Sequence, residues 1–189
     1  MNRLIVASAN KGKIREIKEL LGDRYEIISM ADAGINIDIE ETGATFEENA
    51  AIKAKAIFAL CGCPGISDDS DLIVDALNGE PGVYSARYAG NEHDDEKNNQ
   101  KLLAKLKDKT DRSARFVSAV VYYDGKTLIS AEGRVEGKIL TEKKGDNGFG
   151  YDPLFYSTEL KKSFGEASAE EKNSVSHRAR AFKSLMEKL

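Results

Sequence analysis

Three aspartates fall within four positions of the stretch GISDDSDLIVDAL (65–77), at the start of an apolar run. Placed side by side, the carboxylates of Asp68, Asp69 and Asp71 repel one another. Burying any of them without a partner is costly, or shifts its pKa by a comparable amount. The cluster is therefore expected either to face water as a solvated turn or to hold a cation.

A further carboxylate, Glu40, lies in an acidic segment without periodicity (31–44), which is expected to be a loop. A loop carboxylate can meet the turn at Asp68–Asp69 and share a hard cation with it. Mg²⁺ is a suitable cation, because it usually takes one or two carboxylates together with waters and substrate phosphates. Glu48 has a plainer interpretation, since Thr45 and Glu48 fit a helix capping box.

The segment SANKGK (8–13) lies where an expected strand passes into an expected helix. Backbone N–H groups and the positive end of a helix make such a turn a natural place for phosphate. Ser8, Asn10 and Lys13 would add side-chain donors. The P-loop pattern is absent, and the alternative interpretation is a simple polar helix cap.

The glycine-rich segment NGFGYDP (147–153) combines one aromatic ring with one carboxylate. Phe149 could stack on a nucleobase, and Asp152 could accept a hydrogen bond from a base N–H. The alternative is a tight turn with Phe149 buried in the core.

The segment EKNSVSHRARAF (171–182) carries Lys172, His177 and Arg178. Its helix either runs unbroken from Ser168, whose spacing to Glu171 fits a capping box, or breaks near residues 174–176. A break would place the histidine and the arginine in the first turn of the last helix. The plainer interpretation is a solvated, basic helix end.

Hydrophobic periodicity predicts an α/β fold, because a strand, a helix and a second strand follow one another at the start and favour a parallel pair. The capping box predicts the next helix, and Asp124-Gly125 predicts a hairpin turn. The expected strands are at 3–8 and 24–30, on either side of the acidic turn, and in a hairpin within 114–139. The expected helices are at 11–22, at 45–62 and over the second half of 91–109, where the helix should lie on the surface. A final helix is expected to carry the apolar stripe Val175, Ala179, Phe182, Met186 and Leu189.

Composition favours a globular protein of the cytoplasm. Of the 189 residues, 41% are hydrophobic and 32% are charged, and the formal net charge is −4. A negative balance argues against a nucleic-acid binder, but it leaves room for a small anionic ligand held by a few lysines and a metal. The only cysteines, Cys61 and Cys63, lack partners at metal-binding spacing, and free thiols suit a reducing cytosol. No apolar run approaches the ~20 residues that a membrane span needs.

Taken in order, the segments SANKGK, EETGATFEENAAIKA, SDDSDLIVDALNGEPGVYSARYAG, GFGYDP and EKNSVSHR resemble the non-canonical purine nucleoside triphosphate pyrophosphatases, the ITP/dITP/XTP pyrophosphatase family. The resemblance implies an elongated mixed β-sheet with helical lobes and a central nucleotide cleft, in a single two-lobed domain over residues 1–189. It also implies a homodimer and Mg²⁺-dependent hydrolysis of dITP, ITP and XTP to the monophosphate and pyrophosphate, which cleanses the nucleotide pool. Bacterial relatives usually read DDSG where this chain reads DDSD, so Asp71 is an unusual third carboxylate.

By position, the resemblance implies that Glu40 and Asp69 bind Mg²⁺, that Asp69 is the base for the attacking water, and that Ser70 contacts the substrate. The triphosphate would be held by Ser8, Ala9, Asn10, Lys11, Gly12, Lys13 and Lys53, and the base and sugar by Phe149, Gly150, Tyr151, Asp152, Lys172, His177 and Arg178. Hypoxanthine and xanthine present a 6-keto acceptor where adenine presents a 6-amino donor. Hydrogen-bond donors at the base end of the site would therefore pair with hypoxanthine and xanthine and would oppose the amino group of adenine.

Two rival functions remain open. A Maf-type pyrophosphatase would have a related architecture with a preference for canonical or modified pyrimidine nucleotides. The FGYDP and SHR motifs argue against this function. A non-catalytic nucleotide sensor would have kept the cleft while Asp71 damaged the metal site.

Overall fold

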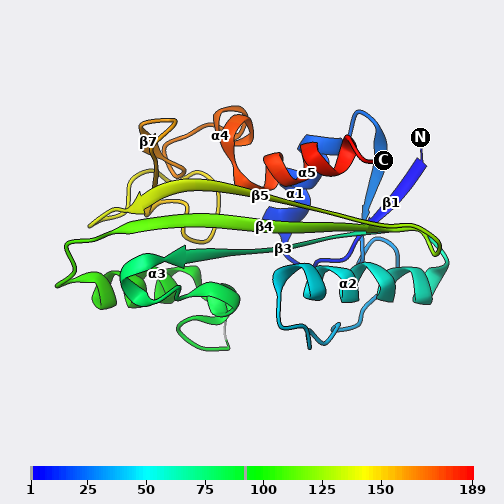
Figure 1. The fold of residues 1–189 in the computed structure, drawn as a ribbon, viewed down its shortest axis with the longest axis horizontal. Helices are drawn as coiled ribbons and strands as arrows, with labels where there is room; N and C mark the ends of the chain where they lie inside the picture. The colour runs from blue at the N-terminus through cyan, green and yellow to red at the C-terminus, as the bar shows by residue number, and fades with distance from the viewer. Residues whose placement is uncertain (1, 92) are drawn as a thin grey trace. The chain divides into compact units, whose positions relative to one another are not determined.

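The computed structural model describes residues 2–91 and 93–189 as a mixed α/β protein built on one seven-stranded sheet, with strand order β2-β1-β3-β4-β5-β6-β7 (Figure 1). The strands are β1 (Asn2–Val6), β2 (Tyr25–Ser29), β3 (Gly65–Val74), β4 (Ser113–Tyr123), β5 (Leu128–Ile139), β6 (Phe155–Ser157) and β7 (Lys162–Ser163). The helices are α1 (Lys11–Leu21), α2 (Phe46–Cys61), α3 (Asp95–Leu106), α4 (Ala169–Val175) and α5 (His177–Met186), with two 3₁₀ turns, η1 (Asp75–Leu77) and η2 (Gly82–Arg87).

The sheet is mixed because its two ends pair differently. β1 runs parallel to both β2 and β3, whereas β6 runs antiparallel to β5 and β7. The predicted α/β fold, the parallel opening pair and the hairpin around Asp124-Gly125 are confirmed. Among the described residues, no helix has the length and apolar character needed to cross a membrane.

The chain divides into two compact units. The first comprises the residues up to Asp69 with 118–133 and 178–189, and the second comprises 70–117 and 134–177. The prediction of a single two-lobed domain stays a prediction.

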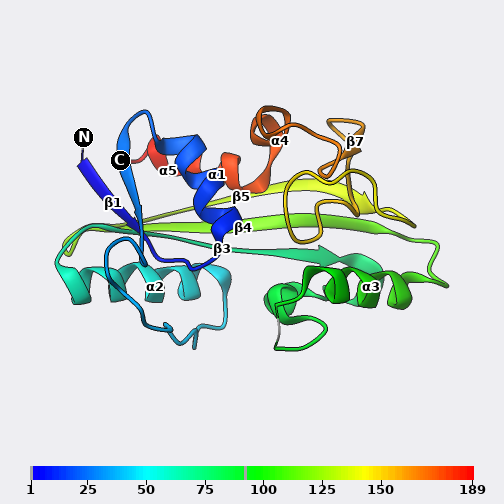
Figure 2. The same cartoon turned by 180° about the vertical axis from the view of Figure 1, so that it is seen from behind.

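In the first unit, α1 and α5 lie on one face of the sheet and α2 lies on the other (Figures 1 and 2). Ile17 of α1 and Phe182 of α5 pack with Val6 of β1 in one apolar cluster, and all three are at most 1% exposed. On the α2 side, Ile57 packs against Ile5. The helices are therefore fixed to the sheet by the apolar stripes that the sequence carries at helical spacing.

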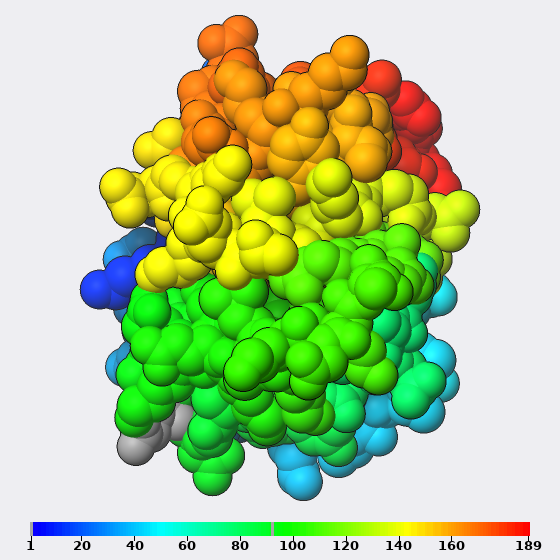
Figure 3. Space-filling view, turned by 90° about the vertical axis from the view of Figure 1, so that its left-hand side faces the viewer, coloured from blue at the N-terminus to red at the C-terminus, as the bar shows by residue number. Residues whose placement is uncertain are grey.

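In the second unit, an apolar cluster joins Leu72 of β3, Leu102 of α3 and Phe155 of β6. The surface of α3 adjoins the segment that follows β5, shown in green and yellow in Figure 3, and there Glu96 and Lys143 form an ion pair. The other side of α3 is buried, including Asn98 and Asn99. The prediction of a surface helix within 91–109 is confirmed, but the helix begins earlier than predicted, at Asp95, and ends at Leu106.

Both helix starts with a capping box are present. Thr45 and Glu48 form the box at α2, and Ser168 forms the equivalent box at α4. Ser176 then adopts an extended conformation, so the last helical segment breaks and α5 begins at His177. Of the two alternatives for this segment, the break is confirmed.

One expectation about local structure is wrong, and another is only partly right. The acidic residues do not form a turn between two strands, because β3 runs unbroken from Gly65 to Val74, and Asp71 is not among the described residues with positive φ. The final apolar stripe is confirmed at Phe182, which is buried, and at Val175 and Met186, which pack against core clusters. Leu189, however, is 46% exposed, and the buried Ala181 and Leu185 were not part of the predicted stripe.

Candidate functional site

The predicted phosphate segment forms the N-terminal cap of α1. The side chain of Asn10 accepts a hydrogen bond from the N–H of Lys13 at 3.1 Å, and Ser8 Oγ accepts from the N–H of Asn10 at 3.1 Å. The first turn of α1 contains no acidic side chain, so its positive end is not neutralised by its own residues. The helix-cap interpretation of SANKGK is therefore confirmed, and phosphate binding at this positive helix end stays a prediction.

Two lysines of the first unit converge on one backbone carbonyl. Lys53 Nζ lies 3.3 Å from the carbonyl oxygen of Asp68, and Lys13 Nζ lies 3.5 Å from the same atom. Lys53 also contacts Asp69 Oδ1 at 3.0 Å and Glu41 Oε1 at 2.7 Å. Two ammonium groups from α1 and α2 thus meet beside the carboxylate predicted to be the base.

The neighbouring carboxylates keep Lys53 in its charged form. Burial, the largest single effect, lowers the pKa of Lys53, but the carboxylates of Asp69 and Glu41 together outweigh it and hold the pKa above its usual value. Lys53 is 9% exposed and stays an ammonium ion at neutral pH.

Asp68 has a different environment from Asp69, because successive residues of a strand point to opposite faces of the sheet. Its carboxylate receives Arg178 Nη2 at 3.0 Å and Lys13 Nζ at 3.1 Å, as well as the hydroxyl of Ser118. Arg178 also donates to Glu16 on α1. Burial opposes the charge of Arg178, but Asp68 and Glu16 raise its pKa above the usual value.

This network corrects the expectation for Asp68, whose carboxylate lies neither in a solvated turn nor in need of a metal ion to neutralise it. Asp68 is 1% exposed and is neutralised by cations of the protein itself. Three elements far apart in the sequence, α1, β3 and α5, supply those charges. Charge-assisted hydrogen bonds of this kind make the burial of a carboxylate tolerable.

The second unit holds a separate group of predicted residues. Asp152 Oδ2 accepts from Lys172 Nζ at 2.6 Å and from the N–H of Phe149 at 3.0 Å. The Lys172 ammonium lies 4.9 Å from the centroid of the Phe149 ring, so ring, cation and carboxylate form one compact set. Phe149 is only half-buried, so the alternative that places it in the core is wrong.

Tyr151, not Phe149, is the core residue of the GFGYDP segment. It is 6% exposed and belongs to the main apolar cluster of the second unit. Its hydroxyl donates to the carbonyl oxygen of Ser85 at 2.6 Å, and burial raises its pKa well above the usual value. This bond joins the two most distinctive motifs of the sequence, PGVYSARYAG and GFGYDP.

Gly148 has a steric reason to be glycine. It adopts φ of +74°, and a Cβ built there would lie 2.0 Å from Asp152 Oδ2. A side chain at this position would displace the carboxylate that holds Lys172 and Phe149.

The remaining predicted residues lie as follows. His177 is 4% exposed and stacks on Phe116 with a centroid separation of 4.8 Å and an interplanar angle of 15°. Ser70 is half-buried on β3, and Glu40 is exposed in the loop before α2. The structure therefore brings Lys13, Lys53, Asp69 and Arg178 together in the first unit, and Phe149, Asp152 and Lys172 together in the second.

Sequence reasoning missed Glu16 and gave no role to Glu41. Glu16 had a detectable signal, because it shares a helix face with Lys13, Ile17 and Leu20, and a carboxylate on an apolar stripe needs a buried partner. Glu41 carried no comparable signal, since nothing in its spacing distinguishes it from Glu40.

The donor set agrees with Mg²⁺ bound jointly with a nucleotide. In the described part of the chain, no group of three or more histidine, cysteine, aspartate or glutamate side chains is placed to hold a metal by itself. Asp69 and Glu41 nevertheless converge on one cationic group, the ammonium of Lys53. Two carboxylates near one cation position are sufficient for Mg²⁺ when phosphates and waters complete its shell.

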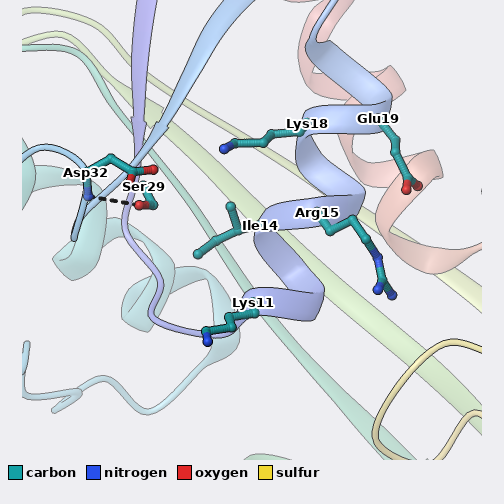
Figure 4. A pocket seen from close by; sticks show the side chains of 7 residues that line it. All are labelled: Lys11, Ile14, Arg15, Lys18, Glu19, Ser29 and Asp32. Atoms are coloured by element: carbon teal, nitrogen blue, oxygen red, sulfur yellow. Dashed lines mark hydrogen bonds between the residues drawn. The ribbon is translucent and has the colours of Figure 1, made fainter.

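A surface cavity of about 540 Å³ lies elsewhere in the first unit, between α1 and the end of β2 (Figure 4). The side chain of Lys18 points toward Ser29 and Asp32, whereas Arg15 and Glu19 point away from them. Lys11 also lines this cavity and is its only residue from the predicted phosphate segment.

Comparison with known proteins assigns the family. The profile of the Ham1 family matches residues 4–188. The dITP/XTP pyrophosphatase of Bacillus licheniformis is 50% identical over 98% of this chain and 96% of its own length, and that of Bacillus subtilis is 47% identical over the same shares. The structure of the Staphylococcus aureus Ham1 protein superposes with a TM-score of 0.87 at 44% identity, covering 98% of this chain and 97% of that one. The chain belongs to the Ham1 family.

Proposed function

We propose that the protein hydrolyses non-canonical purine nucleoside triphosphates (dITP, ITP and XTP) to the monophosphate and pyrophosphate, with Mg²⁺ as cofactor. The observation that carries the proposal is the convergence of Lys13 and Lys53 on the Asp68 carbonyl, beside Asp69 and at the start of α1. The family relatives named dITP/XTP pyrophosphatase support the same activity.

The triphosphate end of the substrate is assigned to residues 8–13 together with Lys53. The N-terminal N–H groups of α1 and the two ammonium groups present positive charge to phosphate oxygens. This charge stabilises the pyrophosphate as it leaves, which is the main electrostatic demand of the reaction.

Asp69 is assigned as the base. Its Oδ1 accepts from Lys53, and Oδ2 accepts no hydrogen bond from the described residues, so it can take a proton from water. The water oxygen attacks the α-phosphorus, the bond from that phosphorus to the bridging oxygen breaks, and pyrophosphate departs with the bond electrons. The proton moves from water to Asp69.

Mg²⁺ would be held by Asp69 with Glu40 or its neighbour Glu41, and by phosphate oxygens of the substrate. When bound, it supplies charge neutralisation on the phosphates. The contact between Glu41 and Lys53 makes Glu41 the alternative to the ligand predicted from the sequence.

The base end is assigned to Phe149–Asp152, Lys172, His177 and Arg178. Phe149 offers a half-buried aromatic ring for stacking, and Lys172 lies beside it as a donor for a 6-keto group. The guanidinium of Arg178 already faces Asp68 and Glu16, so its contribution includes holding that network together.

The remaining proposals concern setting and assembly. We infer a homodimer in the cytoplasm that acts on free nucleotides and binds neither nucleic acid nor membranes. The net charge of −4 and the absence of a bilayer-spanning helix among the described residues are compatible with this setting.

The test is a substrate panel. The protein is incubated with Mg²⁺ and ITP, dITP, XTP, GTP, ATP or dTTP, and pyrophosphate release is measured. Preference for the first three supports the proposal. Preference for dTTP would indicate the Maf-type activity, and nucleotide binding without turnover would indicate the sensor.

Asp69→Asn tests the base. The change is nearly isosteric and removes one charge, so turnover should almost vanish while the circular dichroism spectrum stays that of the wild type. Retention of more than about a tenth of the wild-type rate, a loss below ~1.4 kcal/mol of barrier, would exclude Asp69 as the base.

A further inference from the structure

The buried side of α3 fastens two loops of the second unit through two consecutive asparagines. Asn98 accepts from the N–H of Ala89 at 2.7 Å and donates to the carbonyl of Ala86 at 3.1 Å. Asn99 donates instead to the carbonyl of Gly150 at 3.1 Å. Asn98 therefore holds the segment around η2, and Asn99 holds the GFGYDP segment.

Gly150 is held on both of its backbone groups. Its N–H donates to Asp95 Oδ2 at 2.9 Å, while its carbonyl accepts from Asn99. Asp95 and Asn99 are four residues apart and lie on one face of the helix. Two bonds to one residue, which adopts φ of +61°, fix the peptide planes on either side of it and so the directions of Phe149 and Tyr151.

The amide of Asn99 is poorly explained by stability alone. Asn99 is 3% exposed, and its Oδ1 is buried without a hydrogen-bond partner among the described residues. A buried acceptor left unsatisfied is destabilising, and leucine would fill nearly the same volume without it. The hydrogen bond from Asn99 Nδ2 to the Gly150 carbonyl gives a reason for the amide at this position.

We infer that Asp95 and Asn99 are positioning residues for base recognition: they hold Gly150 so that the ring of Phe149 stays beside Lys172, in the orientation that receives the purine. The inference rests on the proposed function. Neither residue touches the substrate, and both act through the backbone of the GFGYDP segment. The rival explanation is that they only stabilise the second unit.

Three variants separate these explanations. Asn99→Leu removes the hydrogen bond to the Gly150 carbonyl together with the unsatisfied Oδ1. Asp95→Ala removes the hydrogen bond to the Gly150 N–H. Asp95→Asn keeps an acceptor for that N–H and should restore most of the dIMP affinity that Asp95→Ala loses. Gln100→Ala is the control, because Gln100 is exposed on the same helix, and the one side-chain hydrogen bond that it forms with the described residues is to Glu96.

Calorimetric binding of two probes gives the readout. dIMP carries the base end of the substrate, whereas inorganic pyrophosphate carries the other end. Asn99→Leu and Asp95→Ala should each weaken dIMP binding about fivefold, the equivalent of one net hydrogen bond, and leave pyrophosphate binding unchanged. Asn99→Leu should also melt no lower than the wild type, which a purely structural role would not produce.

Several outcomes would overturn the inference. The first is that Asn99→Leu and Asp95→Ala bind dIMP as tightly as Gln100→Ala does, and the second is that they weaken dIMP and pyrophosphate binding equally. The third is that Asn99→Leu melts clearly below the wild type while its dIMP binding is intact. The fourth is that the wild type does not bind dIMP. Failure of the proposed function is recognised separately, as wild-type protein that does not prefer dITP in the substrate panel.

Discussion

Replacing Arg178 by methionine should strongly destabilise the protein, because it removes the cation shared by Asp68 and Glu16. Arg178 and Asp68 have side chains that are 2% and 0% exposed, and the Glu16 side chain is 6% exposed. Breaking a buried ion pair by deleting one partner costs about 3–5 kcal/mol, since the remaining charge stays buried. Lys13 and Ser118 still contact Asp68, so we expect a loss near ~3 kcal/mol at pH 7 rather than the upper value.

The loss should depend on pH in a defined direction. Without the guanidinium, Glu16 and Asp68 each lose a buried cationic partner, so burial favours their protonated forms and the folded variant binds more protons than the folded wild type. Its stability relative to the wild type then falls as pH rises. The deficit relative to the wild type should be largest at pH 8 and shrink toward pH 5, where the carboxylates begin to take up protons.

Urea unfolding of the wild type and Arg178→Met at pH 5, 6, 7 and 8 measures this deficit. Lys183→Met, with the same charge change at an exposed position of α5, is the control and should stay within about 0.5 kcal/mol of the wild type. Arg178→Lys should be intermediate, because a single ammonium cannot bridge two carboxylates as the planar guanidinium does. A pH-independent loss below about 1 kcal/mol for Arg178→Met would refute the reasoning and leave direct recognition of the base as the main role of Arg178.

Three further expectations follow from the site. Glu41→Gln should raise the Mg²⁺ concentration needed for half-maximal turnover more than Glu40→Gln does, and the reverse order would restore Glu40 as the ligand. Gly148→Ala should raise KM for dITP, because its Cβ would lie 2.0 Å from Asp152 Oδ2 at a backbone φ of +74°; an unchanged KM would show that the loop adapts. Asp71→Gly should remain active at saturating Mg²⁺, since β3 needs no special backbone conformation there, and loss of turnover would make Asp71 part of the chemistry.

The elements predicted well from the sequence are those decided by local interactions. The capping boxes of α2 and α4 are complete within four residues, and both were found where the pattern placed them. The opening strand, helix and strand follow from short-range periodicity in the same way. For such elements, the residues that determine the structure are also neighbours in the chain.

The environment of the aspartates could not be predicted in that way. Three adjacent acids favour a solvated turn when only their neighbours are considered. The partners that permit burial of Asp68 lie 55 positions before it, at Lys13, and 110 positions after it, at Arg178. No pattern within β3 indicates these partners, so the sequence predicts a turn where the structure has a strand.

The two asparagines of α3 show what such a failure means for finding functional residues. In the sequence, Asn98 and Asn99 lie in a polar stretch typical of a solvated helix. In the structure both are buried, because each has a backbone group of a distant loop to bind, and only Asn99 leaves an oxygen unsatisfied. A polar side chain at a buried position of an amphipathic helix is therefore informative once the fold is known. Its partner identifies the segment that it positions, and here that segment contains Phe149 and Asp152.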